Sequence, residues 1–314
     1  MERDCWKLAF IFPGQGSQSV GMLGELAADF PLVQQTFVEA SDALDYDLWA
    51  LVQEGPKEAL DSTDKTQPAM LAAGVAVWRV WLAEGGVRAD VMAGHSLGEY
   101  SALVCAGAIE LADAIALVAQ RGHFMQAAVP AGEGAMAAIL GLDDAAVAAV
   151  CVAAAGGDVL QPVNFNSPGQ VVIAGSAAAV ERALDSAKTA GAKRALKLPV
   201  SVPSHCDLMK PAAEQLSAQL RDVKITSPTV PVVNNVEAAL NSDPEAIREA
   251  LIQQLYRPVR WVDVIRVMAS HGVERVVECG PGKVLAGLNR RIERSMVAQP
   301  VFDRASLVKA LGNA

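Results

Sequence analysis

The sequence predicts an α/β protein in which a main domain is interrupted by a smaller inserted one. The chain has 314 residues, which is long for one simple domain and short for two large ones. Short apolar runs typical of buried strands alternate with helical patterns near both ends of the chain, and a different order of elements occupies the middle. Of all residues 52% are apolar and only 5% are aromatic, so we expect a core packed mainly from Ala, Val and Leu.

The first part of the main domain begins with a predicted buried strand, "KLAFIF" at residues 7–12, which is followed by the glycine-rich loop "PGQGSQ". Helical periodicity then extends over residues 23–60. It resumes near Gln67, where a proline lies close to the expected helix start. The run "ADVMAG" at residues 89–94 predicts a second strand that leads directly into a helix, and a further helix is predicted over roughly residues 111–128.

The middle of the chain predicts the order strand, helix, strand, strand, helix, strand. The six segments are "GAMAAIL", "DDAAVAAVCVAAA", "VLQPVNF", "GQVVIAG", "AAAVERALDSAKTAG" and "AKRALKLPV". This βαββαβ order is typical of a ferredoxin-like unit, a four-stranded sheet with two helices on one face. We therefore place a small subdomain at residues 129–200 and the main domain at residues 1–128 and 201–314, where "PVVNN" and "RVVECG" are candidate strands.

Charge and cysteine content restrict the class of protein. The net charge is −9 and no basic run is long enough to follow a phosphate backbone, which argues against a nucleic-acid partner. The cysteines are odd in number and never form a CxxC pair, which favours a reducing compartment over disulfides or a zinc site. They are Cys5, Cys105, Cys151, Cys206 and Cys279. No signal peptide or membrane-spanning run is evident, so we expect a cytoplasmic protein without a membrane or metal partner.

The segment "AGHSLGEYSA" at residues 93–102 contains a GxSxG motif between the predicted strand and helix. In a nucleophile elbow the two glycines permit a strained turn, and the serine oxygen is presented at the N-terminus of the helix. Ser96 is therefore a candidate nucleophile. The alternative is a serine that caps a helix in a glycine-rich turn.

A serine nucleophile needs a base, and the chain has four histidines. His95 lies in the sharp turn and should point away from its neighbour, His123 lies on a helix, and His271 lies at a helix C-terminus beside a glycine. By elimination His205 is the candidate base, since the prolines of "PVSVPSHCDLMKPA" can hold a loop in a fixed position.

A third, acidic member of a triad is not evident. Asp207 is close to His205 in the sequence, but an acid in the first turn of a helix usually interacts with the helix dipole. No persuasive acid lies between Ser96 and His205, where hydrolases of this motif carry it. The sequence therefore favours a Ser–His dyad in which a backbone carbonyl or an amide orients the imidazole.

The backbone can supply donors for an oxyanion. The N–H of Leu97 follows the nucleophile at a helix N-terminus, and a second donor is expected from the loop after the first strand, most simply the N–H of Gln15. That loop could instead hold a nucleotide. However, it lacks the Lys-Ser/Thr pair of a P-loop, and Ser19 stands where a dinucleotide fingerprint has its third glycine, so no nucleotide cofactor is expected.

Arg121 lies late in the apolar helix "LADAIALVAQRGHFM" and has two interpretations. A guanidinium among alanines and leucines needs a carboxylate or phosphate partner. From spacing alone, a surface arginine that extends from the helix end into solvent is the slightly better interpretation. If Arg121 faces Ser96, it could bind a substrate carboxylate and select dicarboxylic half-thioesters.

The motifs "FPGQGSQ", "TQPA", "GHSLGEYSAL", "RGHFMQ", "FNSPGQVVIAG", "VPSH", "QLYRPVRW" and "GPGKVL" occur together, in this order, from residue 12 to residue 285. In this combination the chain resembles the malonyl-CoA:acyl carrier protein transacylases of dissociated fatty acid synthesis. That family also includes the acyltransferase domains of polyketide synthases. The resemblance implies an α/β-hydrolase-like core with an inserted ferredoxin-like subdomain and a ping-pong transfer through an acyl-serine.

The resemblance also implies roles for single residues. It makes Ser96 the acylated nucleophile, His205 its base and Arg121 the ligand of the malonyl carboxylate, with the oxyanion hole formed by the backbone amides of Gln15 and Leu97. Gln254 in "QQLYRP" corresponds to a glutamine whose backbone carbonyl orients the histidine, and Gln67 to a polar residue of the pocket. Malonyl-CoA is the implied substrate, and no metal or bound cofactor is implied.

The implied partner is acyl carrier protein, a small acidic protein. An enzyme with a net charge of −9 must present a local basic surface to such a partner. Two clusters are candidates, although each could also be an ordinary solvated surface. They are Lys193, Arg194 and Lys197 on the insert, and Arg290, Arg291 and Arg294 in "NRRIER".

The sequence is also compatible with a hydrolase or a binding protein. A serine esterase or thioesterase would use the same elbow with water as the acceptor, and a binding protein could keep the elbow without catalysis. Arg121 and the absence of a triad acid favour transfer, and the presence of both Ser96 and His205 argues against a binding protein. The chain is expected to be monomeric.

Overall fold

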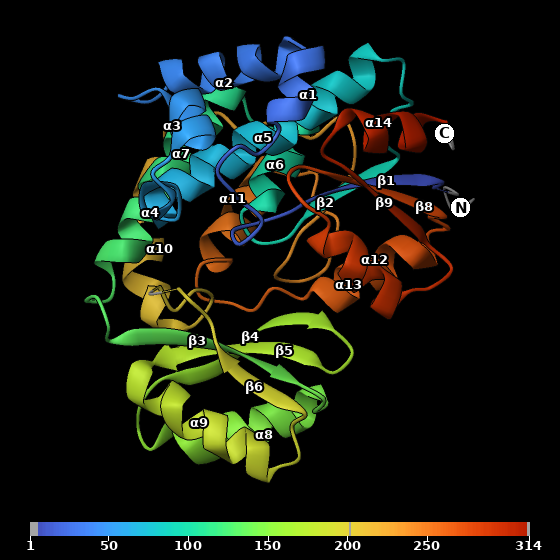
Figure 1. Cartoon of the computed structure of the whole chain (residues 1–314). Helices are drawn as coiled ribbons and strands as arrows, with labels where there is room; N and C mark the ends of the chain where they lie inside the picture. The colour runs from blue at the N-terminus through green and yellow to red at the C-terminus, as the bar shows by residue number, and fades with distance from the viewer. Residues whose placement is uncertain (1–5, 201, 313–314) are drawn as a thin grey trace.

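The computed structural model describes residues 6–200 and 202–312, and contains a large parallel sheet and a smaller antiparallel one (Figure 1). The predicted α/β class is confirmed. Cys5, which entered the cysteine argument, lies outside the described residues.

The large sheet is parallel throughout and has the strand order β7-β2-β1-β8-β9. Its strands are β1 (Leu8–Phe12), β2 (Val91–Gly94), β7 (Val232–Val233), β8 (Arg275–Cys279) and β9 (Val297–Val301). The central strand β1 is buried along its whole length, which explains its continuous apolar sequence. Phe10 and Phe12 pack into a core shared with the N-terminal helices, and Ala9 and Ile11 pack into a second core on the opposite face, with Trp261.

Helices cover both faces of this sheet (Figure 1). Those of the N-terminal half are α1 (Gly24–Asp29), α2 (Leu32–Asp42), α3 (Leu48–Glu54), α4 (Lys57–Leu60), α5 (Thr63–Ala83), α6 (Gly98–Cys105) and α7 (Leu111–Ala127). Those of the C-terminal part are the short 3₁₀ helix η1 (Asp207–Met209), then α10 (Lys210–Leu220), α11 (Pro244–Gln253), α12 (Trp261–Ser270), α13 (Val284–Ile292) and α14 (Arg304–Leu311).

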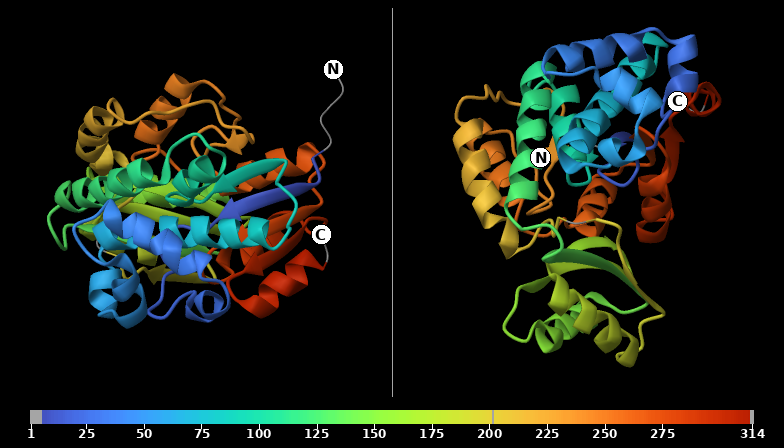
Figure 2. Two further views of the ribbon diagram at one scale, coloured as in Figure 1. Left: turned by 90° about the horizontal axis from the view of Figure 1, so that it is seen from above. Right: turned by 60° about the vertical axis from the view of Figure 1, so that its left-hand side comes forward.

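The inserted unit has the predicted βαββαβ order. Its elements are β3 (Gly134–Leu140), α8 (Asp144–Ala155), β4 (Leu160–Ser167), β5 (Gln170–Ser176), α9 (Ala177–Thr189) and β6 (Arg194–Lys197). The sheet is antiparallel with the order β4-β5-β3-β6, and α8 and α9 cover the face that points away from the large domain (Figures 1 and 2). All six elements fall within residues 129–200, and the domain limits at 128 and 201 stay predictions.

Alternate residues of β3 pack on opposite faces of the small sheet. Ala137 and Ile139 pack against α8 and α9, whereas Met136 packs in a cluster with Cys206, which lies just after His205. The second face therefore contacts the polypeptide that carries the candidate base. This arrangement leaves the carboxyl ends of β1 and β2 facing the small sheet.

The structure gives the limits of two predicted helical regions. The region 23–60, where helical periodicities were predicted, contains four short helices, because Pro31 and Pro56 each stand at the start of a new helix. The helix expected to begin near Gln67 begins at Thr63, so Pro68 lies inside it. Its first turn is held by the N–H groups of Lys65 and Thr66, which both donate to the Ser62 carbonyl.

The strand β9 was missed. It pairs with β8 at the edge of the large sheet and contains Gln299 and Pro300, in the sequence VAQPV. Proline is tolerated at a sheet edge, where one side of the strand has no neighbour to bond. An edge strand with polar residues has neither the apolar run nor the alternation that the prediction required.

Candidate active site

Ser96 lies in a sharp turn between β2 and α6, at the carboxyl edge of the large sheet. Its φ is 52°, in the left-handed region that is strained for a residue with a Cβ atom. The flanking glycines allow this turn, since a Cβ atom on Gly94 would lie 1.8 Å from the backbone carbon of Gly98. A Cβ atom on Gly98 would lie 2.0 Å from the carbonyl oxygen of Phe12. The GxSxG spacing therefore permits close contact between β1, β2 and the start of α6.

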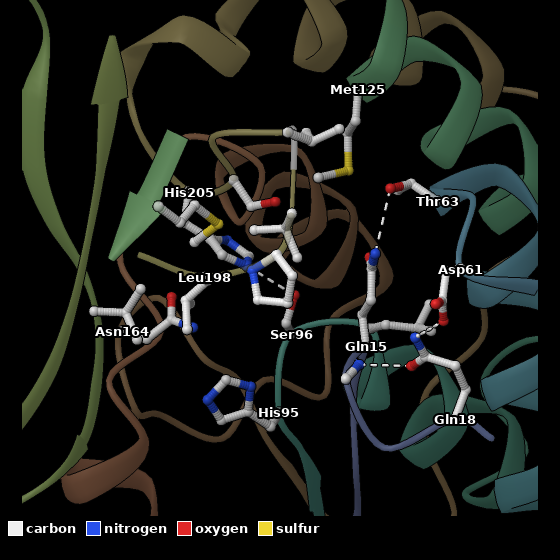
Figure 3. Close-up of a pocket in the computed structure, with 18 of the residues that line it drawn as sticks. Gln15, Gln18, Asp61, Thr63, His95, Ser96, Met125, Asn164, Leu198 and His205 are labelled. Carbon is white, nitrogen blue, oxygen red and sulfur yellow. Dashed lines mark hydrogen bonds between the residues drawn. The ribbon is translucent and has the colours of Figure 1, made fainter. Parts of the chain in front are cut away.

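The side chains of His205 and Ser96 point toward each other in the cavity (Figure 3). Its Nε2 atom lies 2.8 Å from the Ser96 hydroxyl oxygen, and its Nδ1 atom lies 2.6 Å from the backbone carbonyl oxygen of Gln254. Because a carbonyl can only accept, Nδ1 carries the proton and donates it. Nε2 is then left as the acceptor for the Ser96 hydroxyl. The backbone of His205 also has a positive φ, 66°, and its N–H donates to the carbonyl of Leu255 at 2.9 Å.

The imidazole of His205 is held neutral. Burial, and to a smaller extent the nearby positive charge of Arg121, lowers its pKa to about 3. A neutral ring at ordinary pH has a free lone pair on Nε2. It can therefore accept a proton from Ser96 without first losing one.

Among the described residues, Asp207 and the other three histidines make no hydrogen bond to the Ser96 hydroxyl. Asp207 forms an ion pair with Lys210 at 3.0 Å, while the carbonyl of Gln254 occupies the orienting position beside His205. His95 is hydrogen-bonded to the side chain of Asn166 at 2.8 Å. It also lines the cavity, so it is part of the site although it does not act as the base. His271 ends α12 and stacks on a tryptophan, and His123 is exposed.

Arg121 is buried, with 1% of its surface exposed, so the surface interpretation from spacing was wrong. Its guanidinium donates to the side-chain oxygen of Gln67 at 2.7 Å and to that of Gln254 at 3.1 Å. Both of these partners are neutral amides. A buried guanidinium is expected to bind an anion, and Arg121 lines the same cavity as Ser96.

The cavity that joins these residues has a volume of about 470 Å³, within the usual range for small-molecule sites. It lies between the carboxyl edge of the large sheet and the small sheet, which contributes Met136, Asn164 and Val172. Gln15 and Leu97, whose backbone amides are the predicted oxyanion donors, line the same cavity, and the side-chain amide of Gln15 donates to Thr63 at 3.3 Å (Figure 3). Within the described ranges, no cluster of His, Cys, Asp or Glu is suited to a metal ion.

Two polar residues beside the site were not predicted. The side chain of Asn235 accepts from the backbone N–H of Ser96 at 2.7 Å and donates to the carbonyl of Gly94 at 2.7 Å. Glu99 is 3% exposed and bonds both Gln254 and Asn235. The signal that could have found Asn235 is the pair of asparagines at the end of the predicted strand "PVVNN". The carboxyl ends of parallel strands lie at one edge of a sheet, so these asparagines share that edge with Ser96. Glu99 gave no such signal.

The candidate docking residues are all exposed, but they form two separate surfaces. Lys193 directly precedes β6, and Arg194 and Lys197 are its first and last residues, at one edge of the small sheet. Arg290 and Arg291 end α13, which contacts β4 at the opposite edge. Lys197 pairs with Glu181, and Arg291 donates to Gln170 at 2.8 Å. No helix in the described part of the chain is long and apolar enough to cross a membrane.

Residues 9–306 match the family model described as an acyl transferase domain. The malonyl CoA-acyl carrier protein transacylase of Salmonella typhimurium is 60% identical over 97% of this chain and 99% of that protein. The Bacillus subtilis protein of the same name is 46% identical over 97% of this chain and 96% of that protein.

Solved structures agree with the sequence relatives. An acyl carrier protein S-malonyltransferase from Vibrio cholerae has a TM-score of 0.95 and 58% identity, over 97% of this chain and 99% of that one. A malonyl-transacylase solved in complex with a type II polyketide synthase acyl carrier protein has a TM-score of 0.97 and 57% identity, over 98% of this chain and 100% of that one.

Proposed function

Because the chain belongs to the acyl transferase domain family, we propose that it transfers the malonyl group from malonyl-CoA to the phosphopantetheine thiol of acyl carrier protein. The observation that carries this proposal is a Ser–His pair with Nε2 and the hydroxyl oxygen 2.8 Å apart, in one cavity with a buried arginine. The Ser–His pair can carry out acyl transfer, and the arginine can bind a carboxylate on the acyl group.

The first half-reaction acylates the enzyme. Nε2 of His205 takes the proton of the Ser96 hydroxyl as its oxygen attacks the thioester carbonyl of malonyl-CoA. The backbone N–H groups of Leu97 and Gln15 donate to the oxygen that becomes negatively charged. The C–S bond then breaks, and the thiolate of coenzyme A leaves with the proton from the imidazolium.

The second half-reaction reverses these steps with a different thiol. The phosphopantetheine thiol gives its proton to His205 and attacks the carbonyl of malonyl-Ser96. The C–O bond breaks, and the Ser96 oxygen recovers the proton from His205. Throughout, the carbonyl of Gln254 holds the imidazole in the tautomer that accepts at Nε2, which is the task that an acid has in a triad.

Selection of the substrate is assigned to Arg121. A guanidinium can bind a carboxylate through two parallel hydrogen bonds, and the amide oxygens of Gln67 and Gln254 fix the plane of this one. A malonyl group would place its free carboxylate against Arg121 while its thioester lies at Ser96. An acetyl group has no carboxylate to offer the guanidinium.

The remaining properties follow from this reaction. No bound cofactor is needed, since acyl transfer between thiols involves no redox step. We propose that the enzyme acts as a monomer in the cytoplasm and supplies malonyl groups for fatty acid elongation.

Carrier-protein docking is proposed at one of the two basic surfaces, and charge reversal can identify which. Replacing Arg290 and Arg291 with glutamate is expected to raise the KM for carrier protein about tenfold, while the KM for malonyl-CoA stays unchanged, because surface charges steer an acidic partner. The matched variant replaces Lys193 and Arg194 with glutamate at the opposite edge. Steady-state transfer assays compare both. An unchanged KM for carrier protein in a variant would exclude that surface.

The function is tested by intact-protein mass spectrometry after brief mixing with malonyl-CoA, in parallel with acetyl-CoA. One malonyl group on the enzyme, little labelling from acetyl-CoA, and loss of the label when holo acyl carrier protein is added are expected. Consumption of malonyl-CoA without carrier protein and without an adduct would favour a hydrolase. An unlabelled enzyme with intact malonyl-CoA would favour a binding protein.

A further inference from the structure

Glu99 is a buried carboxylate for which the reaction described above has no role. It lies in the first turn of α6, three residues after Ser96, and is 3% exposed. One of its oxygens, Oε2, accepts from the side-chain amide of Gln254 at 2.7 Å and from the backbone N–H of Asn235 at 3.0 Å. Burial raises its pKa to about 7, against the opposing effect of these two hydrogen bonds. An acid that served only the helix dipole could remain in solvent and avoid this cost.

The first of these bonds fixes which way the Gln254 amide points. Its nitrogen donates to Glu99 and to the carbonyl of Ser96 at 3.1 Å, and its oxygen accepts from Arg121. The two ends of an amide have almost the same shape, so hydrogen-bond partners decide its orientation. Oε2 of Glu99 accepts from both the amide of Gln254 and the N–H of Asn235, so Glu99 keeps the amide nitrogen on its own side and the oxygen toward the guanidinium. The reversed amide would point N–H groups at Arg121, which has no acceptor.

The second bond holds the polypeptide behind the nucleophile. The N–H of Asn235 donates to Glu99, and the side chain of Asn235 bonds the backbone of Ser96 and Gly94 on both sides of the strained turn. Glu99 is thus the shared acceptor of two chains of hydrogen bonds. One leads through Gln254 to Arg121, and the other leads through Asn235 to the turn that carries Ser96.

Gln254 also contacts the base, because its backbone carbonyl accepts from Nδ1 of His205. We propose that Glu99 is a positioning residue, which holds Gln254 and Asn235 so that Arg121, His205 and Ser96 keep one relative geometry. Its contribution is larger for a malonyl group than for an acetyl group, since only the malonyl carboxylate uses Arg121. This inference rests on the proposed function.

The experiment compares Ser96 acylation by malonyl-CoA and acetyl-CoA, followed by rapid mixing and intact-protein mass spectrometry. Glu99→Ala is expected to slow malonylation by about 30-fold and to lower the malonyl-to-acetyl rate ratio by about tenfold, the size expected from lost hydrogen bonds to a charged group. Glu99→Gln keeps an acceptor at the same reach, so its ratio is expected within about threefold of wild type. Glu99→Asp keeps the charge, but its side chain is one methylene shorter and cannot reach both donors. Its malonylation rate and its malonyl-to-acetyl rate ratio are expected to fall further than those of Glu99→Gln.

Glu278 provides a matched control. It is also a buried carboxylate that accepts from two backbone N–H groups, those of Leu285 and Ala286 at 3.0 and 2.7 Å. Glu278→Gln and Glu278→Ala are expected to lower the melting temperature and to leave the rate ratio unchanged. A merely structural role for Glu99 would give the same pattern.

The outcomes separate the two proposals. A wild-type ratio in folded Glu99→Ala, or an Asp variant more active than the Gln variant, would overturn the positioning role. If Glu99→Ala does not fold, the comparison of Glu99→Gln with Glu99→Asp tests the positioning role on its own. Absence of a malonyl adduct on the wild-type enzyme would instead reject the proposed function, and the inference would fall with it.

Discussion

Replacing Ser96 with alanine is expected to remove the malonyl adduct and to reduce malonyl transfer to carrier protein by at least about 10⁴-fold. The hydroxyl oxygen lies 2.8 Å from Nε2 of His205, in the cavity that both residues line. Without the hydroxyl, His205 has no proton to accept, and the two half-reactions lose their shared intermediate. Intact-protein mass spectrometry and a transfer assay measure the two effects.

Ser101→Ala is the control for this substitution. Ser101 lies on α6, the helix that follows Ser96, is buried, and has a hydroxyl with no hydrogen-bond partner among the described residues. Its removal is expected to leave labelling and transfer within about twofold of wild type, as for a polar atom that makes no bond. A malonyl adduct that persists in Ser96→Ala, at wild-type rate, would place the nucleophile elsewhere.

The inserted subdomain could be predicted from the sequence because its signals are local. Each of its strands and helices is bounded by a change of hydrophobic period, and six of them in a fixed order specify one arrangement. The four helices within residues 23–60 and the strand β9 (Val297–Val301) lacked such signals. Proline interrupts the first region, and the edge position of β9 removes the need for an apolar run.

The site was predictable where one short segment determines the geometry. The strained turn at Ser96 depends on glycines two residues away, which the motif contains. Arg121 could not be placed by spacing, because it directly follows the exposed Gln120 near the end of α7, where a long side chain can also extend into solvent. The role of Glu99 depends on Asn235 and Gln254, which are 136 and 155 residues away. No local pattern carries that information.

Replacing Arg121 with alanine is expected to lower the rate of Ser96 malonylation by about 10³-fold, since it removes the charged partner of a buried carboxylate. Acetylation should change much less, because an acetyl group has no carboxylate to lose. The loss of a positive charge also removes one cause that lowers the pKa of His205. That pKa is therefore expected to rise, and the acidic limb of the acylation rate should move to higher pH. The malonyl-to-acetyl rate ratio measures the first effect, and a pH profile with acetyl-CoA measures the second.

Two further variants test whether the lower malonylation rate is caused by loss of the guanidinium at the site. Arg121→Lys keeps the charge without the planar pair of donors, so it should recover part of the malonyl rate and remain at least about tenfold below wild type. Arg79→Ala removes an arginine of α5 that pairs with Glu39 at 2.6 Å on the surface, and should leave the ratio unchanged. If Arg121→Ala slowed malonylation and acetylation equally, the arginine would support the site as a whole. Recognition of the substrate carboxylate would then have to be assigned to another group in the cavity.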